Sequence, residues 1–422
     1  MATLSAEYRD IIARLSRAAD AGIRNSKLEE TARVSEKYWR NWRKLAGVMD
    51  VDPYLDPRKV SYQLKVRALT IFGAAVREGM YGQGKQVARG TVSKAISAIG
   101  QEICMAGDCG ENPVKIPGTD DFLLPIQQML EGFGNDDPAC TKKLPVEVDI
   151  PEELVKMAQN EYSSWKERRV ADLALVMFYY LLRVGEYTST HRNSRGGKKK
   201  KRTNKHKKKK TVNFRVCDVS FFKKDRDGRL RMLSADARAR DIMLADGATL
   251  RLVDQKNGWK NVCIHQQKTG DKILCPVRAL GRIILEIRDI TESKTEWLSA
   301  FKGEKGIQHV VAKDISQAIK FAAGKLDYPG KRSMPIDRID THSLRAGGAN
   351  ALSLSGFSEH QIQKMGRWRS ATFKEYISDQ LSSFTDGMSK AMSQTFQFVN
   401  IAATGAMVDV TDELAPEAAG AA

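Results

Sequence analysis

Residues 341–376 limit what this chain can fold into more than any other stretch, because small residues and helix-capping signals are crowded together there. Thr341 can cap a helix that opens at His342, and the i, i+3 spacing puts His342 and Arg345 on one face of its first turn. The small residues 346–349 lower helix propensity but permit another backbone to approach closely. We therefore expect a tightly packed helix whose cationic start suits an anion.

Two further short helices are predicted after this one. Gly356 is expected to end the first helix, and Ser358 with Gln361 has the pattern of a capping box that opens a second. Ser370 can cap a third helix, which would carry Tyr376. The sequence therefore predicts three short helices in succession, with a tyrosine on the last.

The order of polar residues in this stretch resembles the C-terminal catalytic signature of the tyrosine recombinases, in which a His-x-x-Arg helix, a His or Trp, and a nucleophilic Tyr follow one another. The closest likeness is to the Crypton and DIRS-like recombinases of eukaryotic mobile elements. Their typical HSLRAGGA and GRW segments correspond here to residues 342–349 and 366–368. A lone His-x-x-Arg would be a weak signal, whereas the ordered set is specific. The resemblance implies catalytic roles for His342, Arg345, Trp368 and the nucleophile Tyr376.

An arginine stands directly after a strongly apolar segment. Residues 170–182 are apolar nearly all round, which predicts a buried helix, and Arg183 follows at its end. A guanidinium beside so apolar a helix needs an anionic partner, and Glu186 or the helix C-terminal dipole could supply one structurally. The segment LLRVGEY resembles the first catalytic Arg motif of the family, which implies that Arg183 binds the scissile phosphate.

A small antiparallel sheet is predicted in the second half of the chain. Residues 249–254 and 259–266 can pair as a hairpin about an Asn-Gly turn, which is the strongest short hairpin signal. A Lys-Thr-Gly-Asp turn can then lead into a third strand at 272–275, and alternating apolar residues predict another strand within 211–222.

The resemblance also implies a catalytic lysine, since the family carries a mobile Lys on such a hairpin. QQKTGDKILCP resembles the form in which a Lys-Thr-Gly turn precedes a short strand and a Pro, which makes Lys268 the candidate. Lys256, at the tip of the preceding turn, is the alternative, and a solvated lysine is the structural interpretation of either.

The chemistry implied is phosphoryl transfer without metal or cofactor. Tyr376 would attack a DNA phosphodiester and become a 3′-phosphotyrosine, which keeps the bond energy available for religation. Arg183 and Arg345 would meet the charge on the nonbridging oxygens, and Lys268 would protonate the leaving 5′ oxygen. His342 would manage a proton at the same centre, while Trp368 would position the phosphate by packing and an indole hydrogen bond.

Composition limits the class of protein. The chain has 422 residues, enough for two domains, and 42% hydrophobic residues, as in ordinary soluble proteins. Six Cys occur without a C-x-x-C pair, so reduced intracellular thiols are expected, and a metal site is not. No apolar run approaches membrane-spanning length, and the N-terminal residues lack the apolar core of a signal peptide.

A formal net charge of +18 predicts a polyanionic partner, and nucleic acid is favoured over an acidic membrane. Residues 198–210 contribute ten Lys and Arg, so the rest of the chain still carries +8. This run is expected to act as a nuclear-import signal, a DNA anchor or both, with a solvated loop as the alternative. The DNA-binding lysines predicted in it are Lys198, Lys199, Lys200, Lys201, Lys207, Lys208, Lys209 and Lys210.

The N-terminal third is predicted to be helical. Residues 1–30 form a helical arm, and residues 31–110 an all-α unit that resembles the SAM-like core-binding domain of the family. Ser35 can cap one of its helices and Thr91 another, with residues 59–77 between them. The first helix has an aromatic face and a basic edge, for which DNA contact is predicted at Lys37, Arg40, Arg43 and Lys44.

The sequence therefore predicts a mainly α protein with a small β-sheet. A linker with one helical turn is expected at 111–146, the catalytic domain at 147–402 with a Lys-rich insertion at 196–210, and a disordered tail at 403–422. The predicted function is a nuclear, mobile-element DNA recombinase or integrase that binds double-stranded DNA and self-associates on it. Alternatives are a catalytically inactive domesticated DNA-binding protein and a type IB topoisomerase, and no membrane partner is expected.

Overall fold

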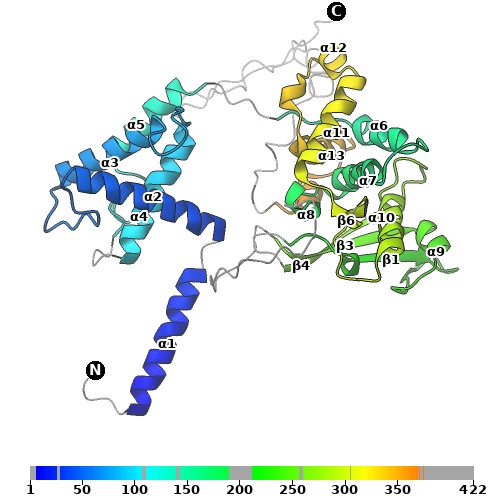
Figure 1. Ribbon diagram of the computed structural model, residues 1–422, viewed down its shortest axis with the longest axis horizontal. Coiled ribbons are helices and arrows are strands. Elements are labelled where there is room, and N and C mark those ends of the chain that lie inside the picture. The colour runs from blue at the N-terminus through cyan, green and yellow to red at the C-terminus, as the bar shows by residue number, and fades with distance from the viewer. Residues whose placement is uncertain are drawn as a thin grey trace, which may run out of the picture. The chain divides into compact units, whose positions relative to one another are not determined.

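The computed structural model describes residues 6–25, 29–106, 111–138, 143–189, 212–255, 260–304, 306–368, 370 and 374. Over these residues the protein is mainly helical, with one four-stranded and one two-stranded antiparallel sheet (Figure 1). The prediction of a mainly α protein with a small β-sheet is confirmed. Within the described ranges, no helix is long and apolar enough to cross a membrane.

The N-terminal part is helical throughout its regular elements. Trp42 lies at the centre of its core, fully buried, with its indole N–H donating to the carbonyl of Pro53 at 2.8 Å and its ring edge-on to Phe72 at 5.6 Å. The helices are α1 (Ala6–Asn25), α2 (Glu29–Val48), α3 (Tyr62–Arg77), α4 (Arg89–Ala106) and α5 (Leu124–Asp136).

Two predicted helix starts in this part are wrong. Ser35 and Thr91 lie inside α2 and α4 rather than at their N-caps. α4 begins at Arg89 because of a tertiary contact. The Asp137 carboxylate accepts the backbone N–H of Arg89 at 2.7 Å and so caps the helix N-terminus. Asp137 also pairs with Arg77, which holds the pKa of this carboxyl below its usual value.

The linker predicted at 111–146 is also corrected by the structure. Its single helical turn is the 13-residue helix α5, and its apolar residues complete the core of the N-terminal part. The Gly, Pro and Asp residues mark turns, but the apolar spacing between them fits a helix packed on α3 and α4. The buried residues that the segment contributes are Val114, Leu123, Ile126 and Leu130.

A second part of the chain is built around α7 (Trp165–Tyr180), which is buried almost all round, as predicted. Ser164 and Glu167 form a capping box at its start. It packs against α6, α10 and α13. The other helices described in this part are α6 (Asp149–Ala158), α8 (Val184–Tyr187), α9 (Ala239–Met243), α10 (Pro276–Ile290), α11 (Ala312–Lys325), α12 (Tyr328–Arg332), α13 (Thr341–Leu354) and α14 (Glu359–Gly366), with 3-10 turns η1 (Val216–Asp218) and η2 (Ile336–Arg338).

The main sheet has the strand order β2-β1-β3-β4, and all its pairs are antiparallel. The predicted hairpin is confirmed, since Leu250 of β3 faces Ile264 of β4 and Asp254 faces Lys260. Its strands are β1 (Val219–Lys224), β2 (Leu230–Met232), β3 (Gly247–Asp254) and β4 (Lys260–Gln267), and a separate hairpin joins β5 (Ala300–Gly303) to β6 (Gly306–His309).

Two other strand predictions are wrong. The strand expected within 211–222 begins only at Val219, after the 3-10 turn η1. The strand expected at 272–275 is absent, because the Asp271 carboxylate accepts the N–H groups of Ile273 and Leu274 and turns the chain directly into α10.

The start of α13 differs from the prediction by one residue. The N-cap is Asp340, whose Oδ1 accepts the N–H of Thr341 at 2.7 Å, so Thr341 is the first helical residue. Gly356 follows the helix end with φ +79°, as expected for a terminating glycine. The capping box of Ser358 and Gln361 that opens α14 is confirmed.

Candidate active site

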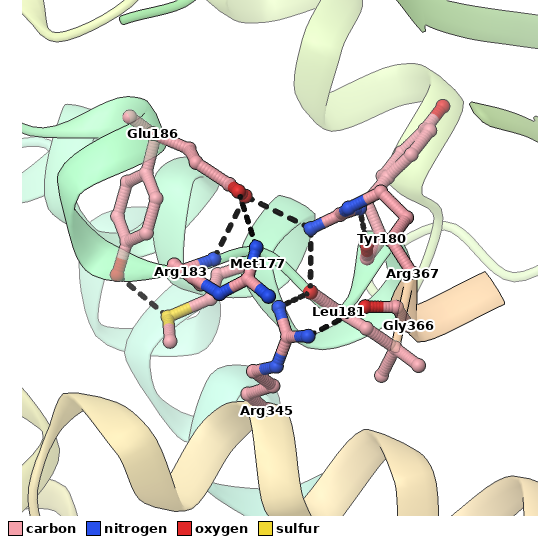
Figure 2. Close-up of polar contacts among 9 residues, drawn as sticks. Met177, Tyr180, Leu181, Arg183, Glu186, Arg345, Gly366 and Arg367 are labelled. Carbon is pink, nitrogen blue, oxygen red and sulfur yellow. Dashed lines mark hydrogen bonds and ion pairs between the residues drawn. The ribbon is translucent and has the colours of Figure 1, made fainter. Parts of the chain in front are cut away.

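The turn between α7 and α8 gathers side chains from distant parts of the chain. Leu181 ends α7 in the left-handed region, with φ 49°, and its carbonyl points into the turn. This single oxygen accepts Nη1 of Arg345 at 2.5 Å and Nη2 of Arg367 at 3.1 Å (Figure 2). The turn that presents Arg183 is therefore tied to α13 and to the end of α14.

The Glu186 carboxylate is a second acceptor shared by several donors. It is fully buried, and it accepts the backbone N–H of Arg183 at 2.9 Å, Nη1 of Arg183 at 3.2 Å and Nη2 of Arg367 at 2.9 Å (Figure 2). Together with Arg345, the cluster holds three guanidinium groups and one carboxylate. This excess of positive charge beside a buried turn favours binding of an anion.

The two arginines that were predicted to bind phosphate are placed differently. The Arg183 side chain is 28% exposed, and over the described residues only its Nη1 has a partner, so Nε and Nη2 are available as donors. Arg345 is 1% exposed, donates to the carbonyls of Leu181 and Gly366, and lies 4.6 Å above the Trp368 ring. Arg183 is therefore the more accessible donor, while Arg345 is held by its surroundings.

His342 lies one helical turn before Arg345 and belongs to the same cluster. Although its side chain is exposed, nearby protein atoms displace water and lower its pKa, and the charges of Arg345 and Arg183 lower it further. Asp340 acts in the opposite direction. The imidazole is therefore neutral at pH 7 and can accept a proton.

The small residues of α13 let it approach two backbones, as the sequence predicts. A Cβ on Gly347 would lie 1.8 Å from the carbonyl oxygen of Val146, and one on Gly348 would lie 2.4 Å from that of Phe178. The N–H of Val146 also donates to the carbonyl of Ser343 at 3.2 Å. The helix turn that carries His342 and Arg345 is thus fixed between α7 and the segment that precedes α6.

Gly366 has a related role in the position of Trp368. A Cβ at Gly366 would fall 1.6 Å from the indole, and the Gly366 carbonyl accepts Nη2 of Arg345 at 2.5 Å. Trp368 is 7% exposed and packs beneath the Arg345 guanidinium. The Gly-Arg-Trp sequence therefore fixes the indole against the cationic cluster.

The two candidate lysines belong to different ends of β4. Lys268 directly follows the strand, and its ammonium pairs with Asp246 at 2.5 Å, which lowers the pKa of that carboxyl. Lys256 lies outside the described residues, between β3 and β4 in the sequence. That end of the hairpin is joined to the cluster, since the N–H of Val212 donates to Asp254 and that of Phe214 donates to the Glu186 carbonyl at 2.9 Å.

The remaining predicted site residues are partly visible. On α2, four basic side chains are exposed beside half-buried aromatic ones, and they are Lys37, Arg40, Arg43 and Lys44. Tyr376, the Lys-rich run 198–210 and the tail 403–422 lie outside the described residues, as does the helix predicted after Ser370. In the part of the chain that the structure describes, no group of three or more His, Cys, Asp or Glu could hold a metal ion.

Sequence reasoning missed Arg367 and treated Glu186 only as a structural partner of Arg183. The Arg183–Glu186 pair is present, but Glu186 also bonds to Arg367, which is 181 residues away in the chain. The one available signal was an arginine placed between two residues that were expected to be packed, Gly366 and Trp368.

No protein-family model matches this chain, and no curated protein does. Among solved structures, the Tn1549 transposon integrase in complex with circular intermediate DNA is similar, with a TM-score of 0.46, 10% identity, and coverage of 89% of this chain and 98% of that one. XerA recombinase gives a TM-score of 0.34, 14% identity and coverage of 90% and 98%. XerH recombinase bound to its difH substrate gives a TM-score of 0.42 and 11% identity, with coverage of 79% of this chain and 72% of that one. Likeness at this level does not decide an activity, so the function has to be argued from this chain's own residues.

Proposed function

We propose that this protein is a site-specific DNA recombinase or integrase of a mobile element, which cleaves and rejoins DNA through a 3′-phosphotyrosine. The observation that carries the proposal is the convergence of Arg183, His342 and Arg345 around the α7–α8 turn, with more positive charge than Glu186 can balance. Fixed cationic donors of this kind stabilise the charge that develops on a phosphodiester during substitution.

In the proposed reaction, the Tyr376 oxygen bonds to phosphorus as the bond from phosphorus to the 5′ oxygen breaks. Neutral His342 is suited to accept the phenolic proton. Arg183 offers Nε and Nη2 to the nonbridging oxygens. Arg345 is the second arginine that we assign to the same phosphate, because its guanidinium is held in the cluster by the carbonyls of Leu181 and Gly366.

The leaving 5′ oxygen takes a proton from a lysine, for which Lys268 and Lys256 remain the candidates. Lys268 would have to leave Asp246 before it could act. Two backbone hydrogen bonds favour Lys256. Val212 donates to Asp254 at the end of β3, and Phe214 donates to Glu186, so this end of the hairpin is tied to the arginine cluster. Only one of the two is needed, since a single proton is transferred.

Double-stranded DNA is the proposed partner, with self-association of the protein on it. The exposed basic edge of α2 supports DNA contact by the N-terminal part, and the +18 net charge supports a polyanionic partner for the whole chain. We assign the Lys-rich run 198–210 to nuclear import and to DNA contact. The likeness of residues 342–349 and 366–368 to Crypton and DIRS-like sequences supports a mobile-element origin.

The proposal is tested by trapping the protein on a suicide DNA substrate taken from the ends of its own element. Wild-type protein should form a covalent adduct, whereas Tyr376→Phe should form none while it retains DNA affinity, because only the nucleophilic oxygen is lost. Tyr162→Phe is a matched control, since this tyrosine is 88% exposed. An adduct that persists in Tyr376→Phe would refute the assignment.

The same experiment separates the alternatives. Binding by wild-type protein without any adduct would identify an inactive DNA-binding protein. Relaxation of supercoiled DNA without sequence preference would instead identify a topoisomerase.

A further inference from the structure

Arg367 occupies a backbone conformation that few residues with side chains adopt. It follows α14 with φ +59°, in the left-handed region where glycine is ordinarily preferred. Residues held in such conformations concentrate at functional sites, where the surrounding contacts offset the strain. The Arg367 side chain supplies those contacts, because it is fully buried and donates to Tyr180, Leu181 and Glu186 (Figure 2).

The Glu186 carboxylate requires a cation because it is buried. Two arginines are within reach, Arg183 at 3.2 Å and Arg367 at 2.9 Å. Arg367 is buried with Glu186, whereas the Arg183 side chain is partly exposed. Desolvation lowers the pKa of Arg367, the Glu186 carboxylate raises it, and the charge of Arg183 lowers it. A guanidinium nevertheless stays protonated in proteins. Arg367 is therefore the permanent counterion.

We propose that Arg367 is a positioning residue that neutralises Glu186 and so keeps Arg183 available to the scissile phosphate. This inference rests on the proposed function. Without Arg367, the buried carboxylate would have Arg183 as its remaining cation among its described contacts, and Arg183 would be drawn into a closer ion pair. Arg183 would then serve Glu186 rather than the substrate.

A second consequence concerns the geometry of the turn. Arg367 and Arg345 both hold the Leu181 carbonyl, two residues before Arg183. Arg367 thereby links the α14 end, with Trp368, to the α7–α8 turn as one unit. Loss of Arg367 should affect the step in which phosphate is attacked more than it affects DNA binding.

The test compares Arg367→Gly with a double variant that also carries Glu186→Gln. Glycine suits the φ of +59°, so the change removes the guanidinium without adding backbone strain. On the suicide substrate, Arg367→Gly should slow cleavage about 100-fold, the usual loss for one misplaced donor, while the DNA Kd changes less than about threefold. Adding Glu186→Gln should restore about tenfold or more, because the carboxylate that captures Arg183 is gone.

A merely structural role predicts the opposite for the double variant, which would cleave no faster than Arg367→Gly. That result, or wild-type cleavage by Arg367→Gly, would overturn the inference. If Arg367→Gly does not fold, Arg367→Lys decides, since it keeps the positive charge. It should cleave within about tenfold of wild type, and a loss as large as about 100-fold would overturn the role of charge. If wild-type protein itself forms no adduct, the proposed function fails instead.

Discussion

Gly347→Ala should lower the stability of the second part of the chain and disturb the geometry of the cluster of Arg183, His342 and Arg345. The added methyl would lie 1.8 Å from the Val146 carbonyl oxygen, so α13 and the segment before α6 have to move apart. Overpacking of this kind costs about 1–3 kcal/mol, and loss of the Val146–Ser343 hydrogen bond costs about 1 kcal/mol. Alanine recovers about 1 kcal/mol of helix propensity. The expected net destabilisation is about 1–3 kcal/mol.

The assay is a calorimetric melt beside cleavage of the suicide substrate well below the melting temperature. A domain of this size loses about 2–4 °C of Tm per kcal/mol, so a fall of several degrees is expected. Cleavage should also fall about tenfold or more, since the turn that carries His342 and Arg345 shifts.

Gly324→Ala is the matched control for this prediction. Gly324 lies in α11 with nothing within 4 Å of its added Cβ, so alanine should leave Tm unchanged or raise it. If Gly347→Ala melts at or above the wild-type temperature, the close approach of α13 to Val146 is wrong.

Three further predictions follow from the site. Arg183→Ala should slow cleavage by about 100-fold or more with Tm unchanged. Arg345→Ala should slow cleavage and also lower Tm, because it removes a buried guanidinium that bonds to two carbonyls. Equal Tm values for the two variants would contradict the difference in burial. Ala at the general-acid lysine, Lys256 or Lys268, should abolish cleavage of ordinary DNA but spare a substrate with a 5′-bridging sulfur, since a thiolate leaves without a proton; the lysine whose variant is not rescued by sulfur is excluded. Deletion of 198–210 should weaken binding to all DNA sequences alike and reduce its dependence on salt, and a change in the site that is cut would contradict a purely electrostatic role.

The parts of the fold that could be predicted from the sequence are those determined by residues close together in the chain. An Asn-Gly pair in the sequence was enough to predict the pairing of β3 with β4. A capping-box pattern was enough to predict α14, and a continuous apolar run was enough to predict α7. In each case the sequence pattern lies within the helix or hairpin that it predicts, or directly beside it.

The errors have nonlocal causes. Asp137 caps α4 from 48 residues away, which no local pattern around Arg89 shows. Apolar residues of α5 find their partners on α3 and α4, so a segment with the composition of a linker becomes part of a core. The third strand beside the β3–β4 hairpin is β1, from earlier in the chain, which pairs with β3, whereas the sequence analysis placed a third strand at 272–275.

The candidate site divides in the same way. The motif order indicated Arg183, His342, Arg345 and Trp368 as members of one site, and the described structure brings these four together. The bond between Arg367 and Glu186 could not be predicted, because it depends on how two turns face each other after α7, α13 and α14 have packed.

The contacts of residues 143–146 set how this protein can be cut into parts. Lys143 and Leu144 donate to carbonyls of residues 337 and 338, and Val146 donates to Ser343 in the first turn of α13. A fragment that began at Glu147, where composition would place the end of the linker, would therefore lack the segment that packs against the first turn of α13. Residues 143–146 are therefore part of the packed structure that follows them, and a separately expressed fragment of the second part of the chain has to start before Lys143.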